Sequence, residues 1–254
     1  MFEIKRYTSD SQRAWNEYVA KARNATFLFM REYMDYHSDR FCDHSLMFFK
    51  DGKLYALLPA HVSGDVLCSH LGLTYGGLIM NMNVTIVETC ELFAELNDYL
   101  RSIGIHKVVY RPVPWIYHVH PSEEDLYAIF WKCGARLSLR NIGTNIIMSN
   151  NTKWRKDHIR RLRKAHQGGV IVKRDSDITE FWGVLEANLY RKFGASPVHS
   201  LSEMLLLKER FPDNIIQYNA YREDRIIGGL TVYVTQQVIH GQYSSTNDEG
   251  KEFG

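Results

Sequence analysis

Residues 152–173 read TKWRKDHIRRLRKAHQGGVIVK, and this stretch decides how the chain is divided. Basic residues recur through its first half, and Gly168-Gly169 then ends the pattern. Glycine commonly follows the last turn of a helix because it adopts positive φ without strain. The β-branched run 170–173 is typical of a strand. The stretch therefore predicts a basic helix over 152–166 followed by a strand over 170–173, and these two elements begin the second half of the chain.

Outward from this stretch, both halves predict helices alternating with antiparallel strands. In the first half, Asp51-Gly52 is the dipeptide preferred in tight hairpin turns. In the second half, Ser200 followed by Glu203 has the spacing of a helix capping box. Periodicity and breakers predict helices over 9–23, 27–36, 85–103, 125–133, 178–193 and 200–211, and strands over 46–50, 54–59, 66–69, 107–110, 137–148, 215–221, 226–235 and 238–244.

The predicted fold class is α/β, of the α+β kind, in two tandem domains. Each has a mixed, mostly antiparallel sheet with flanking helices. The polar run 149–152 sets the expected boundary, giving domains 1–150 and 151–254.

Bulk composition excludes several classes of protein. The 254 residues are 45% hydrophobic, with a net charge of +2, so neither disorder nor a globally basic DNA binder is indicated. The four cysteines never form a CxxC pair, which favours reduced thiols over a disulfide framework. We find no signal-peptide core and no apolar run long enough for a membrane span. A cytoplasmic location is expected.

The hairpin 226–244 and its continuation carry candidate catalytic side chains. Strict alternation would place His240, Gln242 and Ser244 on one face and Tyr243 on the other. We take Tyr243, His240 and Ser244 as candidates for moving protons. The alternatives stay open: an ordinary half-buried strand tyrosine and a sheet histidine with satisfied hydrogen bonds.

A second group of candidates lies in the first half and suggests an acceptor pocket. His70 and Tyr75 lie close in sequence to the paired glycines Gly76-Gly77, which would let the backbone approach a ligand closely. Arg111, in a proline-rich stretch, could pair with an anionic acceptor. The alternative for this turn is a simple loop between strands.

Two further groups of residues are candidates for binding a metal ion or a phosphate. His118-x-His120 places two imidazoles on one strand face, but no further ligand follows at a familiar zinc spacing, so no metal is expected. Arg160 and Arg163 of the basic helix are candidates for a phosphate-bearing ligand. A solvated helix face is the alternative.

Several strings resemble bacterial proteins of the acyl-CoA N-acyltransferase (GNAT-like) superfamily, in the two-domain arrangement of the Fem-type transferases. The resemblance is carried by TFLFMREYM (26–34), HSDRF (37–41), LPA (58–60), SHLGLTYGG (69–77), RRLRKA (160–165), GGV (168–170), PVHS (197–200), GGL (228–230) and QYSS (242–245). It implies tandem GNAT-like domains and transfer of an acyl group from acyl-CoA to an amine.

The resemblance also implies a donor phosphate loop and a helix after the last hairpin. Residues 247–254 resemble that loop, with Gly250 and Gly254 as its cofactor-binding positions, and the second domain would be incomplete beyond it. Backbone N–H groups at a helix start would be needed to hold a phosphate. We therefore expect a second domain that stops at the phosphate loop.

The sequence leaves three functions open. The first is an N-acyltransferase that uses acyl-CoA and a small-molecule or nucleotide-linked amine, such as an amino sugar or amino acid of the cell envelope. The second is a non-catalytic or truncated acyltransferase-like binding module. The third is a tRNA-dependent aminoacyltransferase, disfavoured because no long helical-arm insertion fits between 178 and 211.

Overall fold

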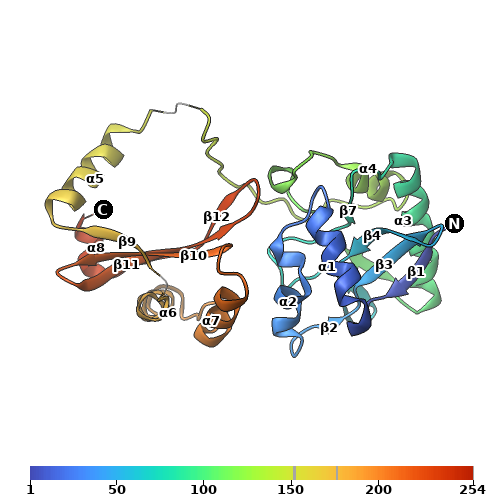
Figure 1. The fold of residues 1–254 in the computed structure, drawn as a ribbon, viewed down its shortest axis with the longest axis horizontal. Helices are drawn as coiled ribbons and strands as arrows, with labels where there is room; N and C mark the ends of the chain where they lie inside the picture. Colours follow the sequence, from blue (N-terminus) through green and yellow to red (C-terminus); the bar gives the residue numbers. More distant parts are fainter. Residues whose placement is uncertain (151–152, 176, 254) are drawn as a thin grey trace. The chain divides into compact units, whose positions relative to one another are not determined.

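The computed structural model describes residues 1–150, 153–175 and 177–253, which form two compact units (Figure 1). The first unit comprises Met1–Ser138 and Thr235–Val238, and the second comprises Leu139–Val234 and Ile239–Gly254. In each unit antiparallel strands carry helices, which confirms the predicted α/β class.

The first unit holds two sheets, with strand orders β1-β3-β4-β7 and β2-β5-β6-β8. Neighbouring strands are antiparallel except for β6 and β8, which pair in parallel. Asp51 and Gly52 both have positive φ in the β3–β4 turn, as a tight hairpin requires. The strands are β1 (Glu3–Arg6), β2 (Cys42–Asp43), β3 (Leu46–Lys50), β4 (Lys53–Leu58), β5 (His61–Ser63), β6 (Val66–Cys68), β7 (Ile79–Met80) and β8 (Lys107–Val109).

Helices of the first unit pack on these strands through apolar faces. They are α1 (Gln12–Lys21), α2 (Arg31–Met34), α3 (Ile86–Ser102) and α4 (Glu124–Trp131). The Thr85 hydroxyl caps α3 by accepting the Glu88 N–H at 3.3 Å. Leu92, Phe93 and Leu96 of α3 are buried in one core with the strands, and this burial fixes α3 against the sheet.

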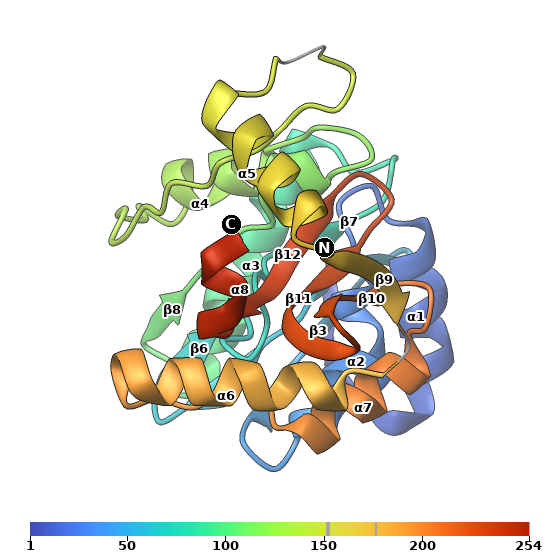
Figure 2. The ribbon, with the colours of Figure 1, turned by 90° about the vertical axis from the view of Figure 1, so that its left-hand side faces the viewer.

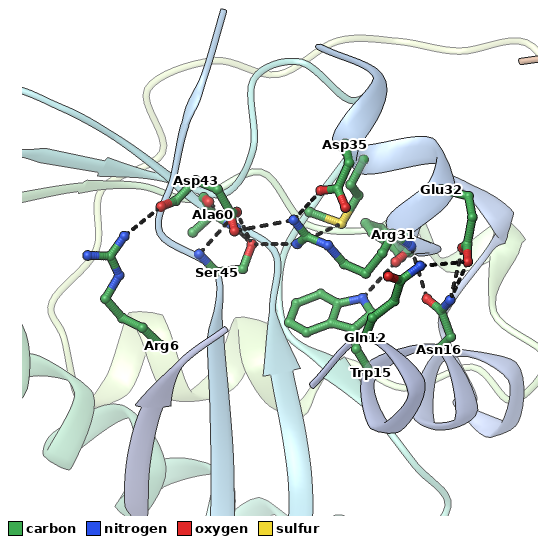
Figure 3. A network of polar contacts seen from close by, with 12 residues as sticks. Arg6, Gln12, Trp15, Asn16, Arg31, Glu32, Asp35, Asp43, Ser45 and Ala60 are labelled. Atoms are coloured by element: carbon green, nitrogen blue, oxygen red, sulfur yellow. Dashed lines mark hydrogen bonds and ion pairs between the residues drawn. The ribbon is translucent and has the colours of Figure 1, made fainter. Parts of the chain in front are cut away.

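A buried guanidinium ties α2 to the edge of the second sheet (Figure 3). Arg31, 3% exposed, forms ion pairs with Asp35 and Asp43 and donates to the Ser45 hydroxyl at 3.4 Å. Asp43 also accepts from Ser45, so carboxylate, hydroxyl and guanidinium form one network. Buried charge is tolerated when it is paired in this way.

The second unit is one antiparallel sheet of order β12-β11-β10-β9. Figures 1 and 2 show α6 and α7 on one face and α5 and α8 on the other. Ser200 and Glu203 form the predicted capping box at the start of α7. The elements are α5 (Lys156–Gln167), β9 (Ile171–Asp175), α6 (Thr179–Phe193), α7 (Leu201–Arg210), β10 (Ile215–Arg222), β11 (Arg225–Val234), β12 (Ile239–Thr246) and α8 (Asp248–Phe253).

Two predicted segments were wrong. Residues 137–148, predicted as a strand, form no strand: apolar alternation favours extended backbone, but a strand also needs a partner edge. Residues 248–253, expected to be a loop, form α8. The Asn247 side chain accepts the Gly250 N–H at 2.8 Å and thereby starts this helix, a signal the sequence interpretation overlooked.

Candidate functional site

The edge strand β12 is bulged, and the bulge decides which side chains share a face. Thr231 pairs with Tyr243, whereas the next residue of β11, Val232, pairs with Gly241, so Gln242 is extra. Directly opposed residues of an antiparallel pair point to the same face. His240, which is opposite Tyr233, therefore shares the face of Tyr243. The predicted alternation was wrong here because an extra residue shifts the period.

Tyr243 packs against Trp182 of α6 and against His199, which directly precedes α7. Its hydroxyl lies 2.5 Å from Nδ1 of His199 and 3.4 Å from the His199 backbone N. The Trp182 ring meets the Tyr243 ring edge-on, with 5.2 Å between centroids. Burial raises the pKa of the Tyr243 phenol, and hydrogen bonds from the His199 backbone and Gln242 act in the opposite direction. The phenol therefore stays protonated at neutral pH.

The other two predicted catalytic residues differ in their placement. His240 is half-buried on the Tyr243 face, and burial lowers its pKa, which favours the neutral imidazole. Ser244 is opposite Leu230 and lies exposed on the opposite face, toward α5 and α8. Of the three candidates, only His240 and Tyr243 are brought to one face.

A basic groove, about 820 Å³ in volume, lies between α5 and α8 at the end of β12. Both predicted phosphate-binding residues, Arg160 and Arg163, line it, and Thr246 of β12 forms part of its wall. The α5–α8 contact is held by Lys164, which donates to the Glu252 carbonyl. The groove is lined by Arg160, Arg161, Arg163, Lys164, Gln167, Thr246, Lys251, Glu252 and Phe253.

Gly250, predicted to bind the donor, lies on the inner side of α8. A side chain at this position would overlap the Ile227 carbonyl oxygen, and the Gly250 N–H already donates to Asn247. Its glycine character is therefore explained by close packing of α8 on β11. Gly254, the other predicted cofactor-binding residue, lies outside the described residues.

The predicted acceptor residues of the first unit are held by internal hydrogen bonds. The Tyr75 hydroxyl, buried, donates to Thr26 at 3.0 Å. The Gly76 N–H donates to the Arg111 carbonyl at 3.0 Å, which joins two of the predicted residues through backbone atoms. A side chain at Gly76 would overlap the backbone of Ser69. Arg111 itself is exposed, and its guanidinium donates to the Leu73 carbonyl at 3.3 Å.

His70 lies in a buried cluster of histidines. Its ring centroid lies 5.1 Å from that of His37 and 5.4 Å from that of His61. Burial, with smaller effects of these histidines and of Arg31, lowers the pKa of His70 to about 3. Its φ of 47° is a left-handed conformation that is uncommon outside glycine and asparagine.

Within residues 1–150, 153–175 and 177–253, no group of three or more histidine, cysteine, aspartate or glutamate side chains is arranged to hold a metal ion. Over the same residues, every helix is too short or too polar to cross a bilayer.

Comparison with known proteins gives matches among solved structures only. No family model matches the chain, and no curated protein sequence matches it. A crystal structure of FemX superposes with a TM-score of 0.60 at 8% identity, covering 99% of this chain and 82% of FemX. The chain has the fold of FemX. At this identity the likeness defines the fold and leaves the reaction open.

A second solved structure is the ribosomal-protein-S18-alanine N-acetyltransferase from Escherichia coli. Its TM-score is 0.32 at 15% identity, covering 42% of this chain and 64% of that enzyme.

Sequence reasoning missed three residues of the Fem-type second unit. His199 and Trp182 contact Tyr243 from 44 and 61 positions away, and no local pattern signals such contacts. Lys251 lines the basic groove from a segment expected to be a loop. The one available signal was the PVHS string (197–200), where a histidine directly precedes a helix cap.

Proposed function

We propose that this chain is an N-acyltransferase that moves an acyl group from acyl-CoA to an amine acceptor, such as an amino sugar or amino acid. The Tyr243–His199 pair carries the proposal, because it places a protonated phenol on the bulged edge strand of a GNAT-like sheet. The proposal includes the bacterial origin and cytoplasmic location expected from the sequence.

The reaction asks little of the protein beyond positioning and proton transfer. An amine attacks the thioester carbonyl, the C–N bond forms, and the C–S bond breaks as a proton moves from nitrogen to sulfur. Tyr243 is the group that would exchange this proton. Among the described residues β12 pairs only with β11, so outward N–H groups along its free edge would polarise the carbonyl.

The basic groove supports a donor that carries phosphates. Thr246 is three residues beyond Tyr243, or roughly 10 Å along a strand. A donor lying along the edge of β12 would thus reach the groove with its phosphates while its acyl group stays near Tyr243. Arg160 and Arg163 would bind the phosphates through charge-assisted hydrogen bonds.

A second donor, aminoacyl-tRNA, is favoured by one observation. The FemX likeness covers 99% of this chain, and the resemblance of the sequence to Fem-type transferases implies an aminoacyl-tRNA donor as an alternative. An RNA backbone would use the same basic groove. Its binding would fall steeply with salt concentration, because each phosphate contact releases counterions.

The direct test is titration calorimetry of the protein with acetyl-CoA, followed by thiol release in the presence of amino sugars and amino acids. Acetyl-CoA should bind, and the double variant Arg160→Ala/Arg163→Ala should weaken binding about 100-fold or more, since each of the two charged hydrogen bonds contributes roughly 1.5–3 kcal/mol. Lys192→Ala, at an exposed position of α6, is the matched control and should bind normally.

Two outcomes would contradict the acyl-CoA proposal. Salt-sensitive binding of aminoacyl-tRNA without binding of acetyl-CoA would favour the second donor. Binding of acetyl-CoA without thiol release for any amine would favour a non-catalytic binding module. In that case Tyr243→Phe should bind acetyl-CoA with the same affinity as the wild type.

A further inference from the structure

His199 is placed next to Tyr243 by the start of α7. It directly precedes Ser200, the N-cap residue, whose hydroxyl accepts the Glu203 N–H at 3.2 Å. The Glu203 carboxylate accepts the Ser200 N–H at 2.7 Å in return. This reciprocal pair fixes the backbone at the helix start. His199, which is 6% exposed, is therefore held in one position against Tyr243 of β12.

The hydrogen bonds around the Tyr243 hydroxyl define the direction of its proton. The backbone N–H of His199 and the side-chain amide of Gln242 both donate to the phenol oxygen, so they take its two lone pairs. The phenol proton then points to Nδ1 of His199, 2.5 Å away, and Nδ1 must act as the acceptor. A substrate amine would therefore reach the Tyr243 oxygen by taking the place of the Gln242 amide.

We propose that His199 is the positioning residue of acyl transfer, receiving through the Tyr243 hydroxyl the proton that leaves the substrate amine. This inference rests on the proposed function. As the C–N bond forms, the amine gives a proton to the Tyr243 oxygen, and the phenol proton passes to Nδ1. As the bond to the leaving group breaks, the same path returns one proton to its sulfur, or to oxygen if the donor is an ester. No proton is gained or lost overall.

The surroundings of the pair limit which charges act on it. From α7 the charged neighbour is Glu203, and from α6 Trp182 contributes an indole. From β12 Gln242 contributes a neutral amide, and the titratable His240 shares the face of Tyr243. Burial raises the pKa of the Tyr243 phenol, so tyrosinate alone is a poor resting base at neutral pH. A neutral imidazole next to the phenol supplies the missing acceptor.

The first test needs no turnover. Nitrogen NMR of histidine-labelled protein should show an unprotonated Nδ1 for His199, and Tyr243→Phe should change that signal. A protonated Nδ1 in the resting protein would overturn the inference whatever the activity. If no donor turns over, the proposed function fails, while this measurement still decides the direction of the hydrogen bond.

The second test separates proton transfer from structure. In His199→Asn, the side-chain oxygen replaces Nδ1 as an acceptor but does not titrate in the histidine range. We expect normal folding, kcat lowered about 100-fold with KM little changed, and loss of the decrease in rate that the wild type shows at acidic pH. If His199→Asn keeps the wild-type rate and pH profile, His199 has only a structural role. Because His199→Ala can disturb folding, it serves for comparison only.

Discussion

The guanidinium carbon of Arg31 lies 3.8 Å from the centroid of the Tyr7 ring, while the same guanidinium pairs with Asp43. One buried side chain thus connects α2, β2 and the segment before α1 through an ion pair and a cation–π contact. The consequence is that the stability of the first unit depends on a single charge.

Arg31→Met should lower the free energy of unfolding by about 3 kcal/mol, because it leaves the partly buried Asp43 without its cation. Urea unfolding followed by the fluorescence of the buried Trp15 measures this change. Arg13→Met removes an exposed ion pair with Glu17 and should leave the unfolding midpoint unchanged. Equal effects of both substitutions would contradict the special role of Arg31.

The histidine cluster predicts acid sensitivity of the first unit. The pKa of His70 is about 3 in the folded protein, below the ordinary value of about 6.5, so folding favours neutral His70. This contribution is complete above pH 6.5 and is lost as the pH falls toward 3. His70→Asn tolerates the left-handed backbone and does not titrate there.

The measurement for His70 is the urea midpoint at pH 7, 5 and 4. His70→Asn should lose less stability than the wild type over this interval, by up to about 1.4 kcal/mol for each pH unit. His106→Asn, at an exposed position, is the control and should follow the wild type. Parallel pH curves for all three proteins would refute a role for His70.

Gly250→Ala tests packing against ligand binding at α8. The added methyl group would overlap the Ile227 carbonyl, so we expect a loss of about 1–3 kcal/mol and faster hydrogen exchange in α8. Gly183→Ala, inside α6 with open space around it, should instead stabilise by about 0.5–1 kcal/mol. Undiminished stability of Gly250→Ala with weakened donor binding would restore Gly250 as a ligand-binding residue.

Ser200→Ala removes one half of the capping box at α7. We expect a loss of about 1 kcal/mol and a weaker His199–Tyr243 hydrogen bond, since the cap fixes the backbone next to His199. Thermal unfolding and the His199 nitrogen signal report the two effects. Ser202→Ala, which keeps the cap, should change neither by a comparable amount.

The sequence predicted those elements whose signals are local. The Asp51-Gly52 turn and the Ser200–Glu203 box each lie within four residues, and both are present. The Fem-type fold was also predicted. It became visible through short strings spread over both halves, and the FemX likeness now supports it.

The candidate site was less predictable because its contacts cross long stretches of chain. The bulge at Gln242 follows from pairing between two strands, and strict alternation along one strand cannot reveal it. Helix α7 and strands β10 and β11 lie between His199 and Tyr243 in the chain. The α8 start was readable from Asn247, but six residues give too little periodicity to identify a helix.

The extra residue in β12 affects the shape of the strand and not its pairing with β11. Removing Gln242 would leave every cross-strand pair with β11 unchanged. The pairs on either side of it, Thr231 with Tyr243 and Val232 with Gly241, would then follow one another as in a regular antiparallel ladder. Tyr243 and His240 would keep their orientation, while the bulge and the Gln242 hydrogen bond to Tyr243 would be lost. The bulge at this edge is thus determined by the number of residues in β12. Deletion of the Gln242 codon would remove the bulge and leave Tyr243 and His240 on the same face.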